Sequence, residues 1–230
     1  MPNYYPVMLD IRGKVAIVVG GDEIAAEKAA GLVAAGAEVR VISPRFCDAL
    51  LILAEQKKVA LSPKAYQKGD LAGAFLVIAA TNDPQLAETV WNESQERGQP
   101  INVVDMPRYC SFILPSILRR GQLTIAVSTE GASPGLAKRI RQQLEKLFPA
   151  AYEPYLRLAS AARSRLRTSH VTYQQRDDFF GDYYASDVLA RLEDGDTARA
   201  AAITEALLRD YGVETPAAAL EEEVCGNGSH

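Results

Sequence analysis

Two adjacent glycines, Gly20 and Gly21, form the stretch best suited to hold a ligand. They follow an unbroken apolar run at 15–19 and precede a segment with helical spacing at 24–35, so we expect a strand, a tight turn and a helix. The N-terminus of such a helix offers free N–H groups and the positive end of a dipole, which suits a pyrophosphate. The alternative is a plain strand–helix turn that binds nothing.

One residue departs from the dinucleotide-binding fingerprint G-x-G-x-x-G/A at this turn. Counted from Gly20, Ala25 fills the last place, but Asp22 stands where a middle glycine lets the backbone approach the pyrophosphate. A carboxylate in that place should repel the phosphates. We therefore predict a dinucleotide site, weakened by Asp22, whose residues at this turn are Gly20, Gly21, Asp22, Glu23 and Ile24.

Asp105 is the candidate for proton transfer. It follows a further apolar run, and the ligands of parallel sheets bind beyond the carboxyl ends of the strands. The same rule brings to this edge Ser43 and Pro44, after the second expected strand, and Thr81 and Asn82, after the fourth. A carboxylate at such a site is suited to act as a general base. The alternative is that Asp105 only forms a turn.

A third group of residues places hydroxyls and positive charge at a second helix start. Ser128, Thr129 and Ser133 precede an expected helix, so their hydroxyls gather at its N-terminus, which is another anion-binding arrangement. Basic side chains follow within the first turns of the same helix, namely Lys138, Arg139 and Arg141.

These basic residues belong to a larger charged block. Between residues 106 and 170, eleven Lys and Arg stand against three acidic residues, a local charge of +8 (11 − 3) in a chain whose net charge is −4. The block predicts an anionic partner, either nucleic acid or a polycarboxylate small molecule. The alternative is a solvated helix surface.

The elements that must position these residues alternate regularly up to residue 105. Expected strands lie at 15–19, 38–42, 59–62, 75–79 and 101–104, with helices between them at 24–35, 48–57 and 84–97. Such alternation predicts an α/β fold with a Rossmann-like, doubly wound parallel sheet.

The second half of the chain changes character. Residues 111–118 are apolar, 122–129 alternate as a strand, and Ser133 with Pro134 begins a helix that carries an apolar stripe. Strand and stripe together predict a dimerisation surface, the alternative being more core. Further helices are expected at 152–167, 183–192 and 197–211. The predicted parts are a dinucleotide-binding domain (1–110), a dimerisation region (111–150), a helical domain (151–215) and a disordered tail (216–230).

Composition is ordinary for a globular protein, with 48% hydrophobic and 23% charged residues among 230. The three cysteines are far apart and form neither a disulfide framework nor a zinc spacing. No apolar run approaches the ~20 residues of a membrane span, and the N-terminus does not have the pattern of a signal peptide. We therefore expect a reduced, cytoplasmic compartment and no membrane partner.

Several stretches together resemble a known family, the bifunctional precorrin-2 dehydrogenase/sirohydrochlorin ferrochelatases of siroheme synthesis. The similar stretches are YYPVMLDIRGKVAIVVGG, AAEKAAGLVAAGAEVRVISP, LVIAATND, INVVDMPRYCSFILPSIL and LTIAVSTEGASPGLAKRIRQQLE, in order between residues 4 and 150. The last two are the most specific. The helical C-terminal part resembles the family weakly. We expect no methyltransferase domain, so the chain resembles the short, stand-alone members.

The resemblance implies NAD-dependent oxidation of precorrin-2 to sirohydrochlorin, then insertion of ferrous iron, as a substrate, to give siroheme. It also implies a homodimer with intertwined central segments and a tetrapyrrole polycarboxylate as the partner of the basic block. Asp105 aligns with the family's proposed general base, in oxidation and in chelation, and Thr129 aligns with a serine near the substrate. The candidate substrate-binding residues are Arg108, Ser128, Thr129, Ser133, Lys138, Arg139 and Arg141.

Asp22 is the departure that matters, because the family has a third glycine there. Two alternatives therefore stay open: a tetrapyrrole chelatase (a lyase) that does not use NAD, and a non-catalytic dinucleotide-binding module. No helix-turn-helix or RNA-binding signature supports a nucleic-acid partner. The loop that follows the second strand lacks the usual acidic residue for the ribose, so it does not decide between NAD and NADP.

Overall fold

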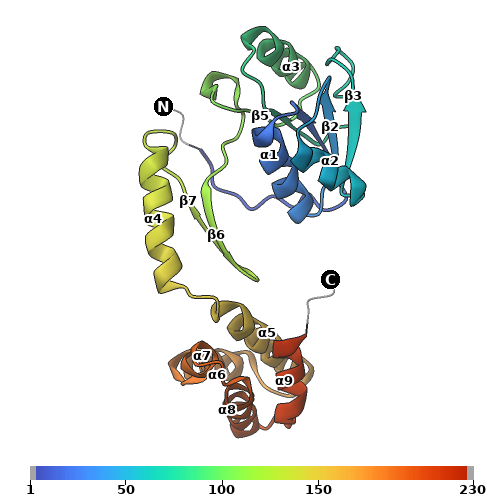
Figure 1. Cartoon of the computed structure of the whole chain (residues 1–230). Coiled ribbons are helices and arrows are strands. Elements are labelled where there is room, and N and C mark those ends of the chain that lie inside the picture. The colour runs from blue at the N-terminus through green and yellow to red at the C-terminus, as the bar shows by residue number, and fades with distance from the viewer. Residues whose placement is uncertain (1–3, 227–230) are drawn as a thin grey trace. The chain divides into compact units, whose positions relative to one another are not determined.

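The computed structural model describes residues 4–226 and divides into two compact units (Figure 1). Unit 1 runs to Leu114 and unit 2 begins at Pro115. None of the helices within the described residues is both long and apolar enough to cross a membrane.

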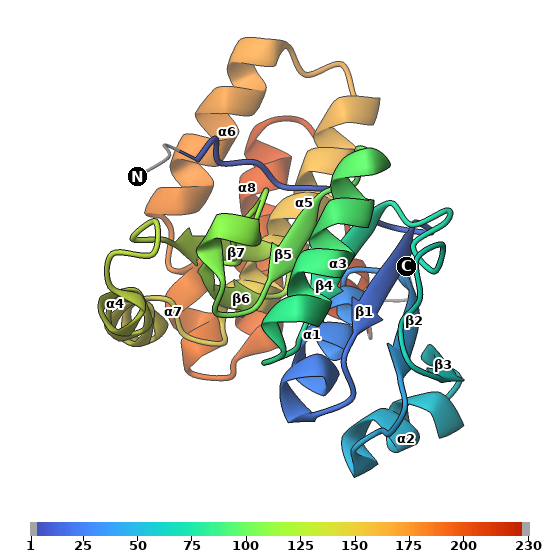
Figure 2. The ribbon, with the colours of Figure 1, turned by 90° about the horizontal axis from the view of Figure 1, so that it is seen from above.

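Unit 1 contains a five-stranded parallel sheet with the strand order β3-β2-β1-β4-β5, as Figure 2 shows. The chain moves outward from β1 to β3 and then returns to the other side of β1, so the order reverses between β1 and β4. Its elements are β1 (Val15–Val19), α1 (Glu23–Ala34), β2 (Glu38–Ser43), α2 (Asp48–Glu55), β3 (Val59–Pro63), β4 (Leu76–Ala79), α3 (Pro84–Glu96), β5 (Ile101–Val103) and the 3-10 turn η1 (Pro107–Tyr109).

Helices cover both faces of this sheet because successive strand residues point to opposite sides. On β1, Ala16 and Val18 pack in one core with α1 and α2, whereas Ile17 and Val19 pack in a second core with α3. All four side chains are buried, which explains the unbroken apolar run in the sequence. The predicted Rossmann-like, doubly wound fold is confirmed.

A buried carboxylate ties the loop between β3 and β4 to α3. Glu93 is 1% exposed and accepts hydrogen bonds from the Tyr66 hydroxyl (2.5 Å), the Gly69 N–H (2.8 Å) and Arg97 Nε (2.7 Å). Burial acts to raise the pKa of Glu93, but these three donors outweigh it and hold the pKa below its ordinary value. Burial and the neighbouring carboxylate raise the pKa of Tyr66.

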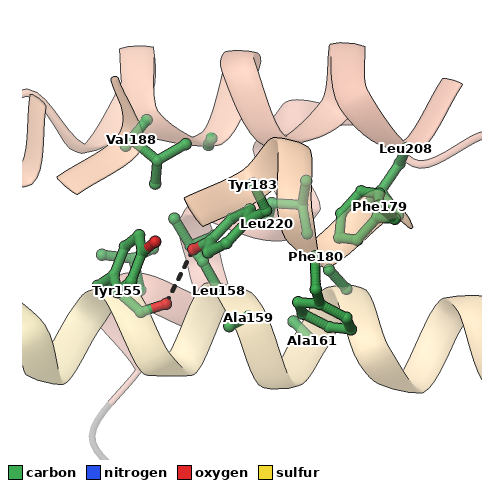
Figure 3. Packing of buried hydrophobic residues seen from close by; sticks show 14 of the residues in the cluster. Tyr155, Leu158, Ala159, Ala161, Phe179, Phe180, Tyr183, Val188, Leu208 and Leu220 are labelled. Atoms are coloured by element: carbon green, nitrogen blue, oxygen red, sulfur yellow. Dashed lines mark hydrogen bonds between the residues drawn. The ribbon is translucent and has the colours of Figure 1, made fainter. Parts of the chain in front are cut away.

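Between Pro115 and residue 226, unit 2 contains a two-stranded antiparallel hairpin and six helices. Its largest core lies among the helices after residue 150, where the fully buried Tyr183 stacks on Tyr155 at 4.9 Å and donates its hydroxyl to the Tyr155 carbonyl (Figure 3). The elements are β6 (Ser116–Arg120), β7 (Leu123–Val127), α4 (Pro134–Leu147), α5 (Tyr152–Thr168), α6 (Tyr173–Ala185), α7 (Val188–Glu193), α8 (Thr197–Asp210) and α9 (Ala217–Cys225).

The predicted disordered tail is wrong for most of its length. Residues from Ala217 to Cys225 form α9, and the remainder after 226 lies outside the described residues. Leu220 and Val224, spaced one helical turn apart, are 0% and 6% exposed in the helical core. Burial of these two side chains packs α9 against the helical core, although most of its other residues are alanine or glutamate.

The helix predicted at 183–192 is also wrong, because Ser186 interrupts it. The Ser186 hydroxyl donates to the Tyr183 carbonyl at 2.7 Å and accepts from the Val188 N–H at 3.4 Å, which ends α6 and starts α7. The start of α6 at Tyr173 follows a capping box formed by Thr172 and Gln175.

The boundary predicted at 110 differs from the one in the structure, and a strand was missed after it. Residues up to Leu114 belong to unit 1, because the Ser111 backbone and side chain bond to Ile101 of β5. Apart from residues 111–114, the predicted dimerisation region falls together with the helical domain in unit 2. Within the apolar stretch, β6 pairs with β7, with Leu118 opposite Ile125.

Candidate functional site

The strand ends of unit 1 meet tightly at the glycine turn. Gly20 has φ +140°, and a Cβ there would collide with the Ala80 carbonyl at the end of β4. A Cβ on Gly21 would collide with the Arg45 carbonyl and the Ser43 hydroxyl after β2. Both glycines are therefore required by the approach of the chain's own loops, at the point between β1 and β4 where Rossmann-like sheets bind their ligands.

Asp22 caps the helix that follows this turn. Its exposed carboxylate accepts a hydrogen bond from the Ala25 N–H, Oδ1 to N, at 2.9 Å, and α1 begins with Glu23. An aspartate is among the best N-cap residues, so the local geometry is favourable. The carboxylate thus occupies the place at which a pyrophosphate oxygen would accept an N–H bond.

The site fits a dinucleotide except for this carboxylate. The turn, the exposed helix start with Glu23 and Ile24, and the crowded glycines are those of a nucleotide-binding strand–turn–helix. Because Asp22 is exposed, its side chain has room to rotate into solvent when a phosphate approaches. Such rotation gives up the helix cap and leaves a negative charge close to the phosphates.

The other predicted cofactor residues lie at the same edge of the sheet. The Ser43 hydroxyl accepts from the Arg45 N–H at 3.4 Å, and Pro44 beside it is exposed. After β4, the Thr81 hydroxyl accepts from the Asp83 N–H at 3.1 Å, while Asn82 is exposed. Hydrogen bonds between neighbouring strand ends, Ala80 N–H to Val19 carbonyl and Val104 N–H to Ala79 carbonyl, hold this edge together.

Asp105 leaves the end of β5 in a left-handed backbone conformation with φ +58°. Its side chain is exposed, and within residues 4–226 its carboxylate accepts no hydrogen bond and forms no ion pair. In the η1 turn that follows, the exposed Arg108 guanidinium lies over the Tyr109 ring at 4.6 Å. The Tyr109 ring is 5.4 Å from that of Trp91 on α3. The turn therefore presents an unpaired carboxylate and a supported guanidinium.

The predicted hydroxyls of unit 2 gather before α4, as expected. Ser133 is the N-cap, its Oγ accepting from the Leu136 N–H at 3.3 Å, and the Ser133 N–H donates to Thr129 Oγ1 at 3.1 Å. Ser128 Oγ accepts from the Glu130 N–H at 3.0 Å. The hydroxyls therefore shape this turn, and each can also donate its proton to a ligand.

Of the three basic residues of α4 that were predicted to bind substrate, two have no ion pair within the described residues and one is paired. Lys138 and Arg139 are exposed and form no ion pair with any residue between 4 and 226. Arg141 is paired with Glu145 one turn later. Lys138 and Arg139 therefore leave more positive charge available to an anion than Arg141 does.

Some features of the two units were not predicted. Side chains of Asn102, Cys110 and Ser111 form hydrogen bonds between β5 and the segment that ends the Asp105 loop. In the sequence these residues stand out only as polar residues in an apolar stretch.

A hollow of about 550 Å³ in unit 2 is lined by residues such as Tyr152 and Tyr184, but by none of the predicted site residues. No three His, Cys, Asp or Glu side chains gather as metal ligands in the part of the chain that the structure describes.

Comparison with known proteins gives two family matches. Residues 7–116 match the family described as "Putative NAD(P)-binding", and residues 120–147 match "Sirohaem biosynthesis protein central". The first match supports NAD as the predicted cofactor. The second covers most of the hairpin and α4.

Similar full proteins and a solved structure agree with these matches. The siroheme synthase of Nitrosococcus oceani is 38% identical over 206 residues, which is 90% of this chain and 44% of that protein. The siroheme synthase of Pseudomonas aeruginosa is 38% identical over 203 residues, 88% of this chain and 44% of the relative. A solved structure, "SirC, precorrin-2 dehydrogenase", has a TM-score of 0.71 and 25% identity and covers 84% of this chain and 98% of its own. This chain spans less than half the length of the curated relatives.

Proposed function

This chain belongs to the siroheme synthase family, and we propose that it oxidises precorrin-2 to sirohydrochlorin with NAD as the oxidant. The observation that carries the proposal is the shared sheet edge in unit 1. The glycine turn after β1 and Asp105 after β5 lie on that edge, separated by β4 alone. A nucleotide-binding turn and an unpaired carboxylate are the two groups that such an oxidation needs.

The chemistry divides one oxidation between these two groups. Removal of two hydrogens from the tetrapyrrole releases a hydride and a proton, and NAD, when bound, accepts the hydride. The Asp105 carboxylate accepts the proton as a general base. Its exposure and lack of a partner within the described residues leave its oxygens open to the substrate.

The substrate would be held through its carboxylates. Arg108 is three residues from Asp105 and its guanidinium can bind a carboxylate through two parallel hydrogen bonds. In unit 2, Lys138, Arg139 and the hydroxyls at the start of α4 offer a second set of groups for anions. We propose these residues, with Arg141, as substrate-binding residues.

We further propose a homodimer formed through the hairpin and α4. Among the 14 residues of α4, Ala137 is the one buried side chain, although the helix carries a strong apolar stripe. Leu136 and Leu147 are 50% and 67% exposed, and Ile117 on β6 is 40% exposed. An isolated two-stranded hairpin is marginally stable in water. A second copy of the chain packed on the hairpin and α4 would stabilise the hairpin and bury the exposed apolar side chains.

Iron insertion is a second candidate function, with ferrous iron as a substrate. Its support is the Asp22 cap, which disfavours NAD without affecting a chelatase. The pyrrole protons must leave as the metal enters, and Asp105 is suited to accept them. Insertion of iron in the absence of NAD would support this function.

The free thiols of Cys47 and Cys110 fit a reducing compartment such as the cytoplasm.

The proposal is tested with Asp105→Asn, which removes the base and keeps the side-chain shape. We expect precorrin-2 oxidation to fall by roughly 100-fold or more, with unchanged NAD binding. Asp83→Asn is the matched control, because it removes a charge from the same edge and asparagine still caps α3. Each variant is assayed in the native chain and with Asp22→Gly. Near-normal turnover of Asp105→Asn would refute the general-base role.

A further inference from the structure

The backbone of β5 is completed by side chains of the loop that follows it. β5 is the last strand of the sheet, so the groups facing away from β4 need other partners. The Ile101 N–H donates to Ser111 Oγ at 2.7 Å, and the Ile101 carbonyl accepts from the Ser111 N–H at 2.8 Å. The Val103 N–H donates to Cys110 Sγ at 3.2 Å, and the thiol donates to the Val103 carbonyl at 3.2 Å. Cys110 and Ser111 thus take the place of a neighbouring strand.

Asn102 adds an anchor from the strand itself. Its side chain is 9% exposed, and Nδ2 donates to the Phe112 carbonyl at 3.0 Å. The returning segment is therefore bound to all three residues of β5. Burial strengthens these bonds, because a broken one would leave a polar group without water or another partner.

Asp105 lies at the start of the loop that these bonds close. The loop has its own hydrogen bonds, Met106 N–H to Val103 carbonyl at 3.2 Å and Cys110 N–H to Pro107 carbonyl at 3.1 Å. The carboxylate of Asp105 has no partner among the described residues, so its position depends on the backbone that carries it. That backbone has φ +58°, a left-handed conformation that is uncommon for non-glycine residues, although aspartate is enriched there, and that surrounding contacts hold.

We propose that Ser111, supported by Asn102, is a positioning residue that holds the backbone of Asp105 in the conformation that aims its carboxylate. The inference rests on the proposed function, because it assumes that Asp105 is the general base. Ser111 touches neither reacting atoms nor cofactor. It acts by closing the loop on β5, so its loss should impair the chemical step more than the binding of either ligand.

The test compares Ser111→Ala with Ser111→Thr, which keeps the hydroxyl. We expect Ser111→Ala to lower kcat for precorrin-2 oxidation by about tenfold or more, with KM for NAD and precorrin-2 within about threefold, and Ser111→Thr to restore most of the rate. The Ser111 hydroxyl accepts from the Ile101 N–H and donates to the Ile101 carbonyl at 3.2 Å. Ser186→Ala in unit 2 is the matched control, because it too loses one donated and one accepted side-chain hydrogen bond. The assays use the native chain and the Asp22→Gly background.

A double-mutant cycle shows whether Ser111 acts through Asp105. Adding Ser111→Ala to Asp105→Asn should cause no further loss of kcat, whereas an equal loss in both backgrounds would overturn the inference. If Ser111→Ala has a normal kcat while Asp105→Asn is slow, the positioning role of Ser111 is refuted and the general-base role of Asp105 is kept. Near-normal turnover of Asp105→Asn would refute the proposed base, and the inference with it.

Amide hydrogen exchange gives a readout that does not depend on activity. In Ser111→Ala the amide of Ile101 loses its acceptor, so we expect exchange at 101–106 to quicken by about tenfold or more, with no change in Ser186→Ala. Unchanged exchange at 101–106 would overturn the inference, because the loop would then be held without Ser111.

Discussion

Asp22→Gly is the substitution that most directly probes the nucleotide site. It removes a carboxylate that caps α1 and occupies the phosphate position. It also restores the glycine of the dinucleotide-binding fingerprint. We expect NAD to bind the variant more tightly than it binds the native chain, because a phosphate no longer meets a negative charge.

The size of the effect follows from the charge and its exposure. Two unit charges ~4 Å apart repel by about 1 kcal/mol in water and by about 4 kcal/mol at an effective dielectric constant near 20. Asp22 is exposed, so the repulsion falls between these limits. The corresponding change in the NAD dissociation constant is about fivefold to about 1,000-fold. Replacing a capping aspartate by glycine costs only a few tenths of a kcal/mol of fold stability.

Isothermal titration with NAD measures this change, and Asp22→Asn separates charge from shape. Asparagine caps a helix about as well as aspartate, so this variant keeps the hydrogen bond to Ala25 and loses the charge. We expect Asp22→Asn to recover the electrostatic part of the affinity and Asp22→Gly to recover that part and the close approach of the backbone. Equal affinity of the native chain and both variants would refute the electrostatic reasoning.

Three further predictions concern the fold and the assembly. Glu93→Gln should lower the free energy of unfolding by about 2 kcal/mol at neutral pH in urea titrations. Because the folded pKa of Glu93 is lowered, its contribution is present above the ordinary carboxyl pKa and is lost as pH falls through the lowered value. A difference between native and variant that persists at the acid end would contradict this. Leu220→Ala should lower the free energy of unfolding by about 2–5 kcal/mol in the same titrations. An unchanged free energy of unfolding would instead support the prediction of a disordered tail. Leu136→Glu should convert the proposed dimer to a monomer in light scattering, while Tyr173→Glu, at an exposed aromatic on α6, should not; a dimeric Leu136→Glu variant would refute the proposed interface.

The helices and strands of unit 1 were predicted well, because short stretches of the sequence indicate where they begin and end. The apolar run of β1 follows from burial on both faces, and the start of α3 follows from Asp83 as N-cap and Pro84 at the first helical position. The cap formed by Asp22 has a signal of the same kind, since aspartate before a helix is a favoured N-cap. This capping role of Asp22 is separate from the charge that its carboxylate presents to a ligand.

Features that depend on tertiary contacts were missed. In α9, Leu220 and Val224 stand in an alanine- and acid-rich stretch, and only the helical core that receives them makes the segment fold. The closing of the β5 edge by Cys110 and Ser111 joins residues about ten positions apart through side chains, and no periodic pattern reports such bonds. The left-handed conformation of Asp105 is equally invisible, because aspartate also occupies ordinary turns.

The most direct test of the proposed function is to incubate the purified protein with precorrin-2 and NAD and to measure both products. We predict sirohydrochlorin and NADH in equal amounts, formed faster by Asp22→Gly and slowed by roughly 100-fold or more by Asp105→Asn. Absence of NADH with both the native chain and Asp22→Gly, under saturating NAD, would contradict the account.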